Sequence, residues 1–205
     1  MLLNDNLFKI MAVFISDYSR QIHGRELSRV SGVCQKTASN LLSRLEVEGV
    51  LSGHSVGKNK NYRLNLKDPA IEHVISVIEE EKAGRFIIGS GLPLDYIARS
   101  RKSGSPLVAV FGSYARGAEK KDSDLDVMAI SPFKVQFRDL ERIYGVKASV
   151  KVLDIKAFRS ALAKNDHLIA EVVRNHVILC GTDLFVRSLL EAGYGRHREQ
   201  DGLVH

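Results

Sequence analysis

Apolar residues recur every three or four positions near the N-terminus, at Leu3, Leu7, Ile10, Met11, Phe14 and Ile15. This spacing predicts an amphipathic helix. A second, short helix is expected after Gly24, and a third from about Gln35 to Glu48, where Ala38, Leu41, Leu42 and Leu45 repeat at helical spacing. Gly49 is expected to end the third helix in a left-handed conformation.

After Gly49 the pattern alternates. Val50 and Leu51 begin a predicted strand, and Tyr62, Leu64 and Leu66 alternate in a return strand. The polar, basic residues 52–61 form the tip of this predicted hairpin. A further helix is expected from Pro69, with Ile71, Val74, Ile75 and Ile78 as its apolar stripe. That stripe suits either a connector packed within the chain or a dimer seam, and residues 79–82 are interpreted as a solvated turn of the same helix.

The C-terminal half begins with a helix from Pro93 to about Lys102 and a wholly apolar run, residues 107–111, which predicts a buried strand. A second strand carries Asp124 and Asp126, and a third covers residues 148–153. A terminal helical region follows, with His167 and His176 expected on helix surfaces. The tail from Gly193 is expected to be mobile.

The turn after the buried strand carries the candidate chemistry. Gly112 permits a sharp turn, Ser113 can cap a helix that starts there, and the free N–H groups of a helix start suit a phosphate. Asp124 and Asp126 lie at i and i+2 of a predicted strand, so their carboxylates point to one face, about 7 Å apart at Cα. Such a pair can hold Mg²⁺ together with substrate phosphates.

Gly112-Ser113, Arg116-Gly117 and Asp124-Leu125-Asp126 resemble the signature of the minimal nucleotidyltransferases of the DNA polymerase β superfamily. The resemblance implies that Asp124 and Asp126 are the catalytic, metal-binding residues, with Mg²⁺ or Mn²⁺ and a nucleoside triphosphate as cofactors. It also implies that Gly112, Ser113 and Arg116 bind the nucleotide. From the residues alone, an ordinary Gly-Ser turn beside an exposed strand edge is the alternative interpretation.

The family places a third carboxylate on a later strand, where it completes a two-metal site that activates the attacking hydroxyl. In the corresponding predicted strand, residues 148–153, Lys151 stands at that position and Ser149 is the only other polar residue. Asp154 follows the strand but fits a helix N-cap better. The nucleotide half of the site is therefore expected to be complete, and the half that activates the acceptor is expected to be incomplete.

The helices and basic hairpin of the N-terminal third resemble a winged helix–turn–helix domain of the MarR/ArsR type. Residues 20–66 hold eight Lys and Arg against three Glu, a net charge of +5 within the chain's total of +6. The resemblance implies contacts with double-stranded DNA from the third helix and the hairpin, through Gln35, Lys36, Thr37, Ser39, Asn40, Arg44, Lys58 and Lys60. A solvated helix face, or a winged helix that binds protein, is the alternative.

Composition agrees with small globular domains in the cytoplasm. The hydrophobic fraction is 44%, and no apolar run approaches the roughly 18 residues of a membrane span. The first residues lack the features of a signal peptide, and no membrane association is expected. The two cysteines, Cys34 and Cys180, are interpreted as free thiols in a reducing compartment.

These observations predict an α/β (α+β) protein with four parts. Residues 1–68 form the winged helix–turn–helix, 69–104 a helical connector, 105–192 a nucleotidyltransferase-like domain with a mixed sheet and helices, and 193–205 the tail. The function expected is that of a DNA-binding transcriptional regulator with a nucleotide-binding module that acts as a nucleotide sensor, and a homodimer is expected. The alternative is an active nucleotidyltransferase that modifies a hydroxyl of a small molecule or of a HEPN-type partner protein, as in toxin–antitoxin pairs.

Overall fold

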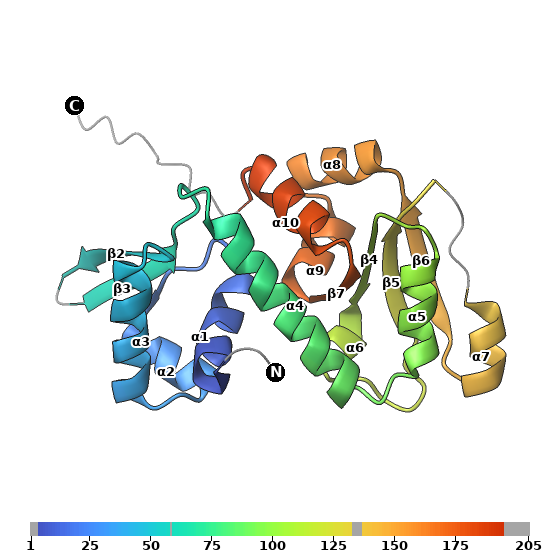
Figure 1. Cartoon of the computed structure of the whole chain (residues 1–205), viewed down its shortest axis with the longest axis horizontal. Coiled ribbons are helices and arrows are strands. Elements are labelled where there is room, and N and C mark those ends of the chain that lie inside the picture. Colours follow the sequence, from blue (N-terminus) through green and yellow to red (C-terminus); the bar gives the residue numbers. More distant parts are fainter. Residues whose placement is uncertain (1–3, 58, 133–136, 195–205) are drawn as a thin grey trace.

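The structure is a computed structural model that describes residues 4–57, 59–132 and 137–194 (Figure 1). The expected tail from Gly193 therefore lies almost wholly outside the described residues, as does Lys58. Among the described helices, none is long and apolar enough to cross a membrane. The combination of helices with two sheets agrees with the α+β class expected from the sequence.

The N-terminal unit, residues 5–64, consists of three helices and a small antiparallel sheet. Its elements are α1 (Asp5–Ile15), β1 (Ile22–His23), α2 (Gly24–Ser31), α3 (Gln35–Val47), β2 (Leu51–Val56) and β3 (Asn59–Leu64). The strand order is β1-β3-β2, with Leu51 opposite Leu64 and Ile22 opposite Tyr62. The three helices are confirmed, and Gly49 has the expected positive φ of 76°. The hairpin is present, but residues 52–56 and 59–61 lie in its strands, so the expectation that residues 52–61 form its tip is wrong. The two-residue strand β1 carries too short a pattern to be predicted.

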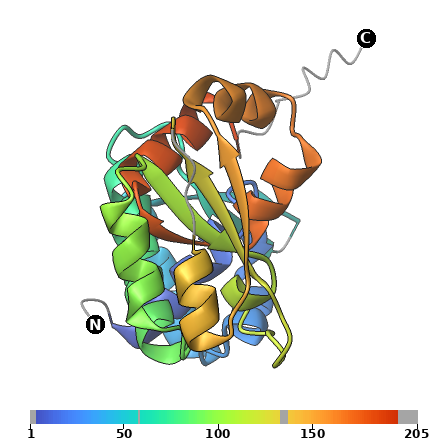
Figure 2. The same cartoon turned by 90° about the vertical axis from the view of Figure 1, so that its right-hand side faces the viewer.

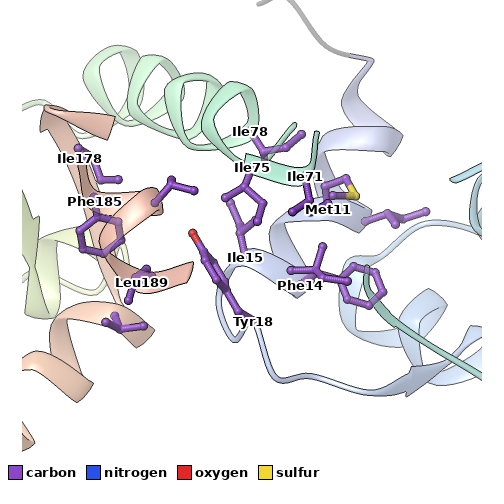
Figure 3. Packing of buried hydrophobic residues seen from close by; sticks show 14 of the residues in the cluster. Met11, Phe14, Ile15, Tyr18, Ile71, Ile75, Ile78, Ile178, Phe185 and Leu189 are labelled. Atoms are coloured by element: carbon purple, nitrogen blue, oxygen red, sulfur yellow. The ribbon is translucent and has the colours of Figure 1, made fainter. Parts of the chain in front are cut away.

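Helix α4 (Ile71–Gly89) lies between the N-terminal unit and the rest of the molecule (Figure 1). Its apolar stripe, with Ile71, Ile75 and Ile78, packs against Met11 and Phe14 of α1 (Figure 3). Because the stripe is buried within one chain, it cannot serve as a seam between two copies. The interpretation of residues 79–82 as a solvated turn is wrong, since Glu79 is 0% and Glu81 7% exposed.

The C-terminal sheet contains β4 (Leu107–Phe111), β5 (Leu125–Ile130), β6 (Ala148–Leu153) and β7 (His176–Cys180), in the order β6-β5-β4-β7. β5 and β6 are parallel and the other pairs antiparallel, so the predicted mixed sheet is confirmed. Strand β7 falls where only helices were expected, and His176, expected on a helix surface, is its fully buried first residue. A short apolar run such as residues 177–179 does not distinguish a strand from a buried helix.

Helices cover both faces of this sheet (Figures 1 and 2). One face, with Met128 and Ile130, packs against α8 (Ile155–Ala163), α9 (His167–Arg174) and α10 (Thr182–Glu191). The other face, with Val127 and Ala129, packs against α5 (Leu94–Lys102) and α7 (Arg138–Tyr144). Since side chains alternate along a strand, Asp126 belongs to the same face as Met128, the face covered by α9.

Candidate functional site

The turn between β4 and α6 (Gly112–Ala115) brings the backbone against a carboxylate. Gly112 has φ +71°, and a Cβ on it would lie 2.5 Å from Oδ2 of Asp126. Both the left-handed conformation and this close approach therefore require glycine. The expected cap by Ser113 is wrong, because Phe111 occupies the N-cap and Ser113 lies inside the helix. The amides of the first helical turn nevertheless begin beside the Asp126 carboxylate.

The two predicted aspartates occupy different environments. Asp126 is half-buried within β5, whereas Asp124 is exposed and precedes the strand, so the expectation that both lie in it is corrected. Burial raises the pKa of Asp126, and the carboxylates of Glu171 and Asp124 raise it further, while Lys151 and Arg116 lower it. Negative charge therefore outweighs positive charge at Asp126, which favours binding of a cation there.

Strand β6 contributes a lysine rather than a carboxylate to this face. In the parallel β5–β6 pair, Ser149 is opposite Asp126 and Lys151 is opposite Met128, so both side chains belong to the Asp126 face. Asp154 caps α8 by accepting a hydrogen bond from the backbone N of Ala157 at 2.7 Å, as predicted. The third strand thus offers no carboxylate to a metal on this face.

Glu171 is a charged neighbour of Asp126 that sequence reasoning missed. It is half-buried on α9, which packs on the face of the sheet that carries Asp126, and its carboxylate raises the pKa of Asp126. The two residues are far apart in the sequence, and only the packing of α9 brings them together. In the part of the chain that the structure describes, no three His, Cys, Asp or Glu side chains are arranged to hold one metal ion.

The donor set fits a hard divalent cation. The carboxylate of Asp126 lies next to the turn at Gly112, and Asp124 is close enough for its charge to raise the pKa of Asp126. Mg²⁺ is commonly held by one or two carboxylates together with substrate phosphates. Arg116, at the exposed C-terminal end of α6, adds a positive charge near the same carboxylate. The site therefore combines cation donors, helix-start amides and two cationic side chains suited to phosphate.

The other predicted surface lies on α3. Its residues Gln35, Lys36, Ser39, Asn40 and Arg44 are exposed, and Thr37 is half-buried with its hydroxyl 3.1 Å from Sγ of Cys34. Arg44 forms a surface ion pair with Glu48 at 3.3 Å. Helix α3 thus presents a continuous polar face to solvent.

Cys34 and Cys180 are both free thiols, Cys34 exposed and Cys180 half-buried.

Lys60 is less free than the sequence suggested. Its Nζ lies 2.6 Å from Oε2 of Glu46 on α3, and 5.5 Å from the centre of the Tyr62 ring. The carboxylate of Glu46 already compensates the positive charge of Lys60. Lys60 would have to exchange Glu46 for a phosphate in order to contact nucleic acid.

Comparisons with known proteins bear on the C-terminal part alone. No match to the chain was found among curated proteins or among solved structures. Residues 97–180, which run from within α5 to the last residue of β7, match the family model of the nucleotidyltransferase domain. This segment, with Gly112, Asp124 and Asp126 inside it, is therefore a nucleotidyltransferase domain.

Proposed function

We propose that this protein is a cytoplasmic, DNA-binding transcriptional regulator whose nucleotidyltransferase domain binds a Mg²⁺–nucleoside triphosphate as a ligand. The observation that carries the nucleotide half is the Asp126 carboxylate, which lies against Gly112 at the start of α6. Asp124 and Asp126 would hold the cation, and the amides at Gly112 and Ser113 would bind phosphate oxygens. The cation would supply charge neutralisation for the triphosphate.

Lys151 favours a ligand role over transfer chemistry. Its ammonium group belongs to the Asp126 face, where the family places a carboxylate for the second metal. A cation at this position repels a second divalent metal and attracts phosphate oxygens. Lys151 and Arg116 would thus neutralise phosphate charge from two sides of the site. Nucleotide binding is then retained, while activation of an attacking hydroxyl is weak.

The order of elements in the N-terminal unit supports a winged helix–turn–helix. A helix, a short strand, two further helices and a hairpin follow one another, and the hairpin pairs with the short strand. Helix α3 would lie in the major groove of double-stranded DNA, with Gln35, Lys36 and Asn40 nearest the bases. Regulators of this kind bind as dimers, and the apolar stripe of α4 is buried within the chain, so another surface would form the dimer contact.

Nucleotidyl transfer to a hydroxyl of a protein, such as a HEPN-type partner, is the second candidate. Glu171 favours it, because its carboxylate lies near Asp126 and could replace the acid that β6 lacks. Incubation with labelled ATP and candidate acceptors separates the two functions. Labelling of an acceptor by the wild type that is lost in both Asp126→Asn and Glu171→Gln would favour the enzyme. No labelling by the wild type would favour the ligand role.

Calorimetry with Mg²⁺–ATP tests the nucleotide site. We expect Asp126→Asn and Asp124→Asn to abolish metal-dependent binding, because each removes a charged donor to the cation. Asp122→Asn, an exposed aspartate of the preceding turn, is the matched control and should bind like the wild type. Unchanged affinity in the Asp124 and Asp126 variants would refute the proposed site.

Titration of DNA at several salt concentrations tests the N-terminal unit. Lys36→Ala should weaken binding to all sequences and reduce the salt slope by about one unit, whereas Asn40→Ala should cost roughly 1–3 kcal/mol on a specific site only. Lys102→Ala, which removes an exposed charge from α5, is the control. Fragments from the gene's own upstream region provide the candidate site. Wild-type protein that ignores DNA at low salt would show that the N-terminal unit binds another partner.

A further inference from the structure

The acidic run on α4 joins the two halves of the molecule. Glu79 accepts a hydrogen bond from the hydroxyl of Tyr18 and faces His176, while Glu80 accepts one from the hydroxyl of Thr182 on α10. Glu81 binds Arg85 at 2.9 Å, and Arg85 reaches Asp5 of α1 at 2.7 Å. Consecutive glutamates thus contact segments from both sides of α4.

Both ring nitrogens of His176 lie within hydrogen-bonding distance of oxygen atoms. Its ring is fully buried, and Nδ1 lies 3.0 Å from the carbonyl oxygen of Val172 and 2.9 Å from that of Val173. Nε2 lies 3.0 Å from Oε1 of Glu79. Both ring nitrogens therefore face acceptors, and a neutral imidazole has only one N–H to donate. A proton on each nitrogen would satisfy both contacts and would pair the ring with the carboxylate of Glu79.

Glu79 lies between two positive groups. Its other carboxylate oxygen, Oε2, is 3.4 Å from Nζ of Lys82. Burial raises the pKa of Glu79, but the charges of His176 and Lys82 outweigh burial and hold it at about 2. The carboxylate is therefore ionised and paired although it is 0% exposed.

Tyr18 brings the N-terminal unit into the same cluster. It follows α1, is 1% exposed, and donates its hydroxyl to Oε1 of Glu79 at 3.4 Å. Figure 3 shows its ring between Phe14 and Ile15 on one side and Phe185 and Leu189 on the other. Burial and the Glu79 carboxylate raise the pKa of Tyr18, so the phenol remains a donor.

The cluster continues to the nucleotide site through the sheet. His176 is opposite Phe111 in the β4–β7 pair, and Phe111 is opposite Asp126 in the β4–β5 pair. Phe111 directly precedes Gly112, the residue that contacts the Asp126 carboxylate. The end of β4 that forms the turn is therefore held on one side by the strand that begins at His176.

We propose that Tyr18, Glu79 and His176 are positioning residues for the Gly112–Asp126 turn, through which the N-terminal unit helps to order the nucleotide site. A link of this kind makes the two halves energetically coupled, so that binding at one changes the affinity at the other by an equal factor. The nucleotide part of this inference rests on the proposed function. The ordering of the turn does not, and can be measured without nucleotide.

Hydrogen exchange followed by mass spectrometry tests the ordering. In Glu79→Gln, without nucleotide, amides of residues 108–126 should exchange roughly tenfold faster, because a buried charge loses its partner. Tyr18→Phe, which removes one hydroxyl and keeps the apolar ring, should give a smaller increase in the same peptides. The first matched control is Glu72→Gln, which is on α4 like Glu79 but forms a surface ion pair with Arg187 of α10. The second is Tyr144→Phe, which removes an exposed hydrogen bond to Asp95. Both controls should leave residues 108–126 unchanged.

Faster exchange confined to the peptides around Tyr18 and His176 would mean a structural role only and would overturn the inference. Mg²⁺–ATP supplies the second measurement. It should slow exchange near Tyr18 in the wild type, and this distant protection should be lost in Tyr18→Phe while residues 108–126 remain protected. Protection near the turn without any near Tyr18 would also overturn the inference. If ATP protects no segment of the wild type, the proposed function fails, and the nucleotide-free exchange still decides whether the turn is ordered by the cluster.

Discussion

Asp126 and Glu79 are both carboxylates within regular secondary structure, yet their surroundings are opposite. Asp126 is half-buried beside two other carboxylates, Glu171 and Asp124, and its pKa is raised. Glu79 is completely buried between His176 and Lys82, and its pKa is lowered to about 2. His176 and Lys82 contact the Glu79 carboxylate directly, whereas the charged groups that act on Asp126 include carboxylates as well as cations. Two carboxylates that are both affected by burial therefore differ in the direction of their pKa shifts because their charged neighbours differ.

The largest expected effect comes from removing the balanced carboxylate. Glu79→Ala should lower the free energy of unfolding by about 3–5 kcal/mol, because it leaves the buried His176 without its partner. Glu72→Ala removes the surface pair with Arg187 and should cost less than about 1 kcal/mol. Denaturant unfolding of both variants measures the difference. Equal losses would show that the buried cluster contributes no more than a surface pair.

Two glycines with similar backbone angles provide the next test. Gly112 and Gly117 have φ of 71° and 63°, so alanine should cost roughly 1–2 kcal/mol at each. At Gly112 the new Cβ would also meet Asp126, whereas nothing lies within 4 Å of a Cβ at Gly117. Gly112→Ala should therefore cost about 1–3 kcal/mol more by denaturant unfolding, and it should also weaken Mg²⁺–ATP binding. Similar losses at the two positions would contradict the close contact between the turn and Asp126.

The pH dependence of stability should show a gradual effect. The pKa of Glu79 is about 2 in the folded protein against an ordinary 4.5, so its ionised form stabilises the fold. This contribution is complete above pH 4.5 and decreases as the pH falls towards 2. Unfolding measured across this range should be less steep in Glu79→Gln than in the wild type. Identical acid dependence would mean that Glu79 is not held ionised by His176 and Lys82.

The candidate nucleotide site was predictable because its parts are close in sequence. Gly112, Asp124 and Asp126 lie within fifteen residues, and the turn and the alternation of a strand relate them locally. The cation on β6, Lys151, was likewise identified from strand position. The exact bounds were less certain, since β5 begins after Asp124 and Ser113 does not cap α6. Local patterns place residues on an element but leave its ends open to tertiary packing.

The buried cluster could not be predicted, because its members are distant in the sequence. The run of residues 79–82 has the composition of a solvated helix turn, and Tyr18 and His176 lie 61 and 97 residues from Glu79. Glu171 reaches Asp126 for a similar reason, through the packing of α9 on the sheet.

The sequence by itself determined the first three helices, the hairpin, strands β4 to β6 and the short spacing of Asp124 and Asp126, since each follows from periodicity or local pattern. Only the tertiary structure decided which charges are buried together and which face the turn at Gly112. Whether a carboxylate is solvated, paired or left for a ligand depends on neighbours that folding brings from elsewhere in the chain.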